Sequence, residues 1–135
     1  MTSKLANRGL VVLLAIACPA AFAQAEPDTD AYDGKWVVNI VGDKTRVHAA
    51  DLVVGDFAGS WRDVGKGSQI KGSACRGKKF PITVQVSQRA KLAFTVWGSA
   101  VSPTCPDLSV ELKPVDAKTL EGTIGNDQRV LLTRR

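Results

Sequence analysis

The chain has little of the chemistry on which enzymes commonly rely. Its one histidine is His48, and no nucleophile motif accompanies it as a Ser-His-Asp or Cys-His mechanism would require. Histidine, cysteine and carboxylate residues do not cluster at metal-ligand spacings, and the 13 Asp and Glu residues are scattered, with no acid pair to nominate. The sequence therefore predicts no enzyme activity, no metal site and no cofactor.

Long apolar runs are also lacking, apart from one near the N-terminus. Lys4 and Arg8 precede the short apolar segment 10–17, and small residues at 21–25 offer a cleavage site. This combination is typical of a secretory signal peptide, and the apolar run is too short to span a bilayer. We therefore expect residues 1–25 to be removed, leaving a periplasmic or secreted protein without a membrane span.

Cysteine is scarce: the chain has three, one near the N-terminus and two in the rest of the sequence. Cys18 lies in the expected signal peptide, so Cys75 and Cys105 remain in an oxidising compartment, where a disulfide is the default expectation. Residues 15–18 distantly resemble a bacterial lipobox, although Ala occupies the usual Leu position and Pro19 follows the cysteine. Simple cleavage is favoured over lipidation at Cys18, which would make the protein an envelope-associated module.

Aromatic residues make up 6% of the chain, and the net charge of +5 includes Lys4 and Arg8 of the expected signal peptide. The rest is thus mildly basic. Nucleic-acid binding would need a basic stripe with interleaved aromatics, so no nucleic-acid partner is expected.

Apolar residues do not recur at helical spacing over any segment of adequate length. They recur instead at every second position. Residues 26–33 are polar, include a proline and have no apolar period, so we expect a flexible N-terminal arm. From residue 34 onward, apolar residues alternate with polar or small ones, as in Phe80, Ile82 and Val84. Such alternation predicts half-buried strands. Eight or nine are expected, near 35–41, 47–54, 57–63, 69–75, 80–87, 91–97, 108–114, 119–124 and 128–134.

The connections between these strands are mostly short, which allows antiparallel hairpins and excludes the long crossovers of a parallel sheet. A sequential meander without a long sheet-switching loop favours a barrel over a sandwich. We therefore predict an all-β fold, an antiparallel up-and-down β-barrel of eight or nine strands formed by residues 34–135. In a meander, the loops at 75–79 and 98–107 fall at the same end, which places Cys75 and Cys105 to pair.

The tripeptide Gly34-Lys35-Trp36 and the basic residue Arg134 resemble features of the calycin-like barrels. These include the lipocalins, the avidins and the small bacterial periplasmic inhibitors of secreted metalloproteases. The segments 57–61 and 94–97 are further similar to avidin-type strands, but a full set of biotin-contacting residues is not matched. The resemblance implies that Trp36 packs across one barrel end beneath Arg134, as structural residues rather than ligand contacts.

Five residues are candidates for ligand binding. The two tryptophans Trp61 and Trp97 are candidates for a ligand platform or a partner anchor, and Trp97 is out of phase with its strand beside the long 98–107 loop. Packing under that loop is the alternative for Trp97. Arg76, Lys78 and Lys79 form a basic loop beside Cys75 that could attract an anion, or could be an ordinary solvated charge run.

Three functional hypotheses follow. The first is a non-catalytic binding protein that captures a small molecule in the barrel interior or at its mouth. The second, implied by the resemblance to the bacterial metalloprotease inhibitors, is an inhibitor of a secreted protease, whose acidic arm, residues 26–33, approaches the catalytic metal of a protein partner. The third is the envelope-associated module.

Overall fold

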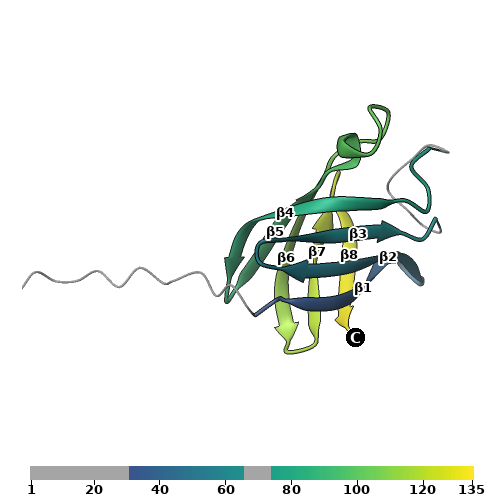
Figure 1. Ribbon diagram of the computed structural model, residues 1–135. Coiled ribbons are helices and arrows are strands. Elements are labelled where there is room, and N and C mark those ends of the chain that lie inside the picture. Colours follow the sequence, from purple (N-terminus) through teal and green to yellow (C-terminus); the bar gives the residue numbers. More distant parts are fainter. Residues whose placement is uncertain (1–30, 66–73) are drawn as a thin grey trace, which may run out of the picture.

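The computed structural model describes residues 31–65 and 74–135, which form a closed barrel of eight antiparallel strands (Figure 1). The predicted all-β up-and-down barrel is confirmed. The predicted strand at 69–75 lies mostly outside the described residues, and Ala74 and Cys75 at its end are in a turn. The elements are β1 (Gly34–Val41), β2 (Arg46–Gly55), β3 (Ala58–Asp63), β4 (Lys79–Gln88), β5 (Lys91–Val96), η1 (Gly98–Ala100), β6 (Leu108–Asp116), β7 (Thr119–Ile124) and β8 (Gln128–Arg134).

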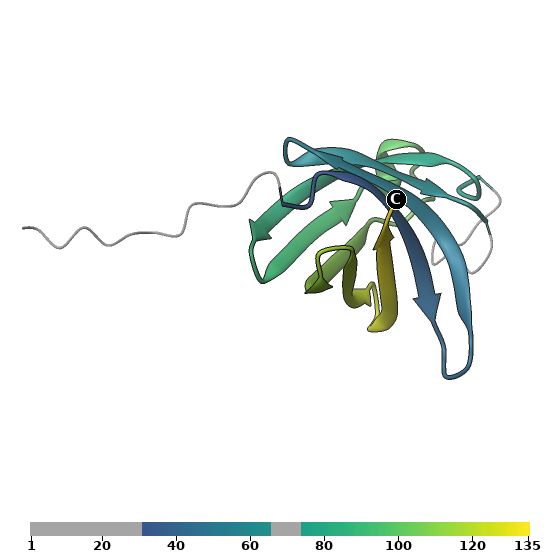
Figure 2. The same cartoon turned by 90° about the horizontal axis from the view of Figure 1, so that it is seen from below.

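Each strand pairs with the next along the chain, and β1 pairs with β8 to close the barrel. Figure 2, seen from below, shows these strands curving round until the first and last lie side by side. Neighbouring strands approach each other very closely at a few places. A Cβ added to Gly122 on β7 would lie 1.8 Å from the carbonyl oxygen of Glu111 on β6, so no larger residue fits there without a shift.

The alternating apolar residues point inward and fill the barrel. In β5, for example, Leu92, Phe94 and Val96 are at most 1% exposed. An eight-stranded barrel has an interior that side chains can just fill. The buried residues form one contiguous cluster, whose largest fully buried members are Trp36, Phe80, Phe94, Leu52, Leu92, Leu120, Ile124 and Leu132.

One end of the barrel, which we call the N-terminal end, carries residues 31–33 and the β2–β3, β4–β5 and β6–β7 turns. Tyr32 is buried there, and its hydroxyl donates to the carbonyl oxygens of Gln88 and Arg89. The indole N–H of Trp36 donates to the Tyr32 carbonyl oxygen at 2.9 Å. The last residues of the arm expected at 26–33 are therefore held against the barrel, whereas residues 26–30 lie outside the described residues.

Arg134 completes this end. Its Cζ lies 4.3 Å from the centroid of the Trp36 ring, and its guanidinium donates to the carbonyl oxygens of Asp33 and Ala31 at 2.6 and 2.8 Å. Trp36 and Arg134 are also directly opposite each other in the β1–β8 register. The pair thus joins the first strand, the last strand and the preceding chain, because a guanidinium is attracted to the face of an indole.

Candidate functional site at the disulfide end

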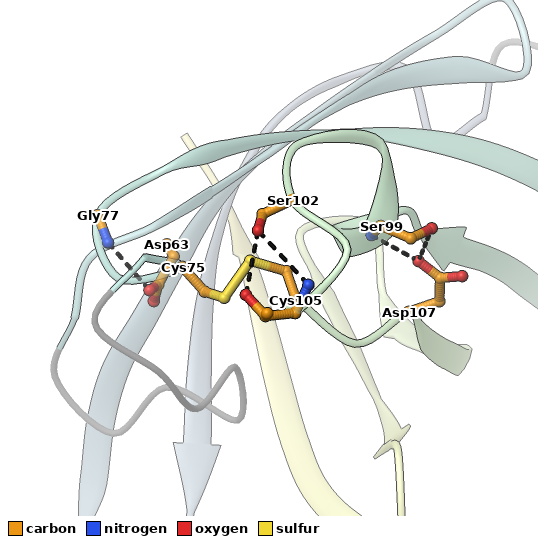
Figure 3. Close-up of a disulfide and its surroundings, with 8 residues drawn as sticks. Asp63, Cys75, Gly77, Ser99, Ser102, Cys105 and Asp107 are labelled. Carbon is orange, nitrogen blue, oxygen red and sulfur yellow. Dashed lines mark hydrogen bonds between the residues drawn. A yellow bond between two sulfur atoms is a disulfide. The ribbon is translucent and has the colours of Figure 1, made fainter.

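The opposite end, which we call the disulfide end, carries the β1–β2, β3–β4, β5–β6 and β7–β8 connections. Cys75 in the β3–β4 connection is bonded to Cys105 in the β5–β6 connection, with a Cα–Cα distance of 5.7 Å (Figure 3). The predicted disulfide is confirmed. Both cysteines are buried, so the bond lies beneath the two loops that it joins.

Asp63, at the end of β3, fixes the part of the β3–β4 connection that is described. It is 1% exposed, and its carboxylate accepts hydrogen bonds from the backbone N–H groups of Gly65 and Gly77, both at 3.1 Å. Figure 3 shows the bond from Gly77. A buried carboxylate is stable when backbone donors satisfy it. Asp63 therefore holds the turn that presents Arg76 and Lys78. Sequence reasoning missed it, although an acid in the inward phase of an apolar strand was the available signal.

The β5–β6 connection is ordered by its own hydrogen bonds. The Oδ1 atom of Asp107 accepts from the backbone N–H and the hydroxyl of Ser99, at 2.9 and 2.8 Å (Figure 3). The backbone hydrogen bond, followed by the hydroxyl, lowers the pKa of Asp107 below its ordinary value because both stabilise the carboxylate. Gly98 passes close to Pro106, where an added Cβ would lie 2.1 Å from the Pro106 carbonyl oxygen. This loop is therefore closely packed on itself.

The two candidate tryptophans lie on opposite sides of the barrel wall. Trp61 is 3% exposed inside the barrel, with its ring centroid 6.3 Å from that of Phe94. Trp97 is 38% exposed outside it, and its indole N–H donates to the hydroxyl of Thr83 at 2.9 Å. The structure therefore presents Trp97 to solvent at the disulfide end and places Trp61 in the core.

The three candidate cations also lie in two different places on the barrel. Arg76 and Lys78 are exposed in the connection beside Cys75. Lys79 begins β4 and is exposed on the outer wall, opposite Arg62 of β3 in the register. The loop of cations expected from the sequence is thus two residues at the barrel rim and one on its side.

Within residues 31–65 and 74–135, no group of three or more His, Cys, Asp or Glu side chains could hold a metal ion. No helix in these ranges is long and apolar enough to cross a membrane.

Comparison of the chain with protein-family models, with curated proteins and with solved structures finds no match. The class that the structure itself defines is a small closed antiparallel β-barrel, consistent with the calycin-like barrels.

Proposed function

We propose that this protein is a non-catalytic binding protein of the periplasm or the extracellular space, which captures a small anionic molecule at the disulfide end of its barrel. The observation that carries the proposal is the bond between Cys75 and Cys105, which ties the loop presenting Arg76 and Lys78 to the loop that follows Trp97. Loops held by a rigid scaffold are where binding residues concentrate.

The mouth of the barrel is a better candidate than its interior. The inward side chains belong to one buried cluster, so a ligand inside would have to displace well-packed residues such as Phe80 and Phe94. At the disulfide end, an exposed aromatic ring and two exposed cations need no such displacement. Exposed cations attract an anion, and an exposed indole at the same end of the barrel offers apolar contact area.

Within the calycin-like barrels, the resemblance extends to the lipocalins, the avidins and the bacterial metalloprotease inhibitors. The Trp36–Arg134 stack at the N-terminal end supports this likeness. It does not select one of the three families.

Titration of the oxidised protein with inorganic phosphate, citrate and decanoate, followed by tryptophan fluorescence, tests the proposal. We expect a saturable change with at least one of the anions. The double variant Arg76→Gln/Lys78→Gln should bind about tenfold more weakly, which corresponds to losing about 1.4 kcal/mol of binding free energy.

The matched control is Arg89→Gln/Lys118→Gln, which removes the same charge at the N-terminal end, where both residues are exposed. Its affinity should equal that of the unaltered protein. A fluorescence response that is absent with all three probes, or that is the same in both double variants, would contradict the proposal.

A second function, inhibition of a secreted metalloprotease by the N-terminal arm, is favoured by one observation. Residues 31–33 are fixed to the barrel by Tyr32, Trp36 and Arg134. The acidic segment that precedes them is therefore attached to the barrel at a rigid point. This point lies at the opposite end from the disulfide, so the two functions use separate surfaces.

Deletion of residues 26–30 distinguishes the two. If the arm inhibits, potency against a panel of secreted zinc proteases should fall at least about tenfold, because the deleted segment carries three carboxylates. Phosphate and citrate binding at the disulfide end should not change. Equal potency with and without the segment would exclude the arm as the inhibitory element.

A further inference from the structure

Two cations face each other across the outer wall of the barrel. Arg62 of β3 and Lys79 of β4 are directly opposite in the antiparallel register, and both are exposed. Like charges in directly opposite positions destabilise a sheet. Among the described residues, no carboxylate lies within salt-bridge distance of either one. The fold therefore keeps two adjacent positive charges on this wall, neither of which forms a salt bridge with a described residue.

The nearest acid in the register is engaged elsewhere. Asp51 of β2 is opposite Arg62, but its Oδ1 atom lies 3.0 Å from His48 Nε2 and 3.0 Å from an Nη2 atom of Arg135. Asp51 is therefore already in an ion pair with Arg135 and hydrogen-bonded to His48. Arg62 and Lys79 thus keep their capacity to bind an external anion.

These cations line a groove. A hollow of about 260 Å³ on the outer wall is lined by four cations, Lys35, Arg62, Lys79 and Arg135, and by one carboxylate, Asp51. Val53 and Ser60 are among its other lining residues. A second hollow shares Ser60 and Lys79 with the first and extends to Pro81. The two together follow the outer face of β1, β2, β3 and β4, which lie side by side in Figure 1.

The groove is not purely polar. Val53 on β2 is 40% exposed, and Pro81 on β4 is also exposed. Beyond Pro81, the backbone N–H of Trp97 donates to the Pro81 carbonyl oxygen, so the exposed indole stands one strand further along the same wall. In the register, Lys35, Val53, Ser60 and Pro81 form one row across β1 to β4, and Asp51, Arg62 and Lys79 form the next row across β2 to β4. Apolar and cationic side chains therefore lie in adjacent rows on this wall.

We propose that this groove, defined by Lys35, Arg62, Lys79 and Val53, binds an acidic peptide segment of a protein partner. Carboxylates of the segment would pair with Arg62 and Lys79, and a guanidinium can hold a carboxylate through two parallel hydrogen bonds. Apolar side chains between the carboxylates would contact Val53 and Pro81. That apolar contact favours a peptide over an anionic glycan, which carries no such side chains.

This site goes beyond the proposed function, because it lies on the side of the barrel and takes a different class of partner. Acidic motifs are commonly recognised by clusters of basic residues on a rigid surface. Four strands of a closed sheet supply such a surface here. Binding should weaken as ionic strength rises, because exposed charges are screened.

The test is fluorescence anisotropy with a labelled eight-residue peptide that alternates glutamate and leucine, beside the same peptide with glutamine for glutamate. We expect saturable binding of the glutamate peptide alone to the full protein. The double variant Arg62→Gln/Lys79→Gln should bind it about tenfold more weakly. The charge-matched control Arg89→Gln/Lys118→Gln should retain full affinity.

Two further protein variants identify the surface that binds the peptide and test whether the chain's own N-terminal segment occupies it. The rim variant Arg76→Gln/Lys78→Gln should bind the peptide with unchanged affinity, so failure of the groove and failure of the proposed function are distinguishable. A protein lacking residues 26–30 should also bind as the full protein does. Tenfold tighter binding by that deletion variant would assign the groove to the chain's own acidic arm and overturn the proposal.

The proposal is likewise overturned if the glutamate peptide does not bind, or if the Arg62/Lys79 variant binds it with full affinity. Binding of a polygalacturonate oligomer in place of the peptide would show that the partner class is wrong.

Discussion

Removing the disulfide, by reduction or by the double substitution Cys75→Ser/Cys105→Ser, should lower the free energy of unfolding by about 3–4 kcal/mol. The bond joins residues separated by 30 positions, so breaking it returns the conformational freedom of a sizeable loop to the unfolded chain. Urea unfolding of the oxidised and reduced proteins measures the difference.

The loss should be local as well as global. Hydrogen exchange should accelerate first in the two connections that the bond joins, including the amides of Gly77 and Ser99. At the other end of the barrel, the amide of Trp36 should keep its protection until global unfolding. Uniform acceleration over all eight strands would contradict the view that the bond chiefly shapes the disulfide end.

The substitution Trp36→Ala should cost about 3–5 kcal/mol of stability, the usual range for deleting a fully buried aromatic side chain. Trp36 is 2% exposed, and its removal would also leave Arg134 without the ring on which it stacks. The carbonyl oxygen of Tyr32 would lose its indole donor, so the attachment of residues 31–33 should weaken.

The matched control for this prediction is Trp97→Ala. It deletes the same side chain at a position that is 38% exposed, so the expected cost is about 1 kcal/mol or less. The two variants are compared by urea unfolding monitored by far-UV circular dichroism, which reports mainly on the backbone and remains usable when one indole is deleted. Equal costs would contradict the structural role of Trp36.

Much of the fold could be predicted because strand alternation is a local property. The inward phase of Phe80, Ile82 and Val84 follows from the two-residue period, and the structure has all three buried. The disulfide could be predicted by counting the strands between its two cysteines. Connections in a meander alternate between the two ends of the barrel, so connections separated by two strands lie at the same end. Neither inference required knowledge of which side chains touch.

The candidate site was harder to predict, because its parts meet across strands. Trp61 and Trp97 are both aromatic residues near strand ends, yet one is in the core and the other is outside the wall. Arg76, Lys78 and Lys79 are almost consecutive in the chain, but the last belongs to a strand and faces Arg62. The buried roles of Tyr32 and Asp63 likewise depend on backbone groups supplied by distant or irregular segments.

The sequence by itself therefore determined the class of fold, the order of the strands and the pairing of Cys75 with Cys105, since these follow from periodicity and from connection lengths. Only the tertiary structure decided which cations gather on the outer wall and which aromatic ring reaches solvent. The reason is that the neighbours of a side chain on a sheet are set by the register of adjacent strands. That register is fixed by the packing of the whole barrel rather than by any one segment.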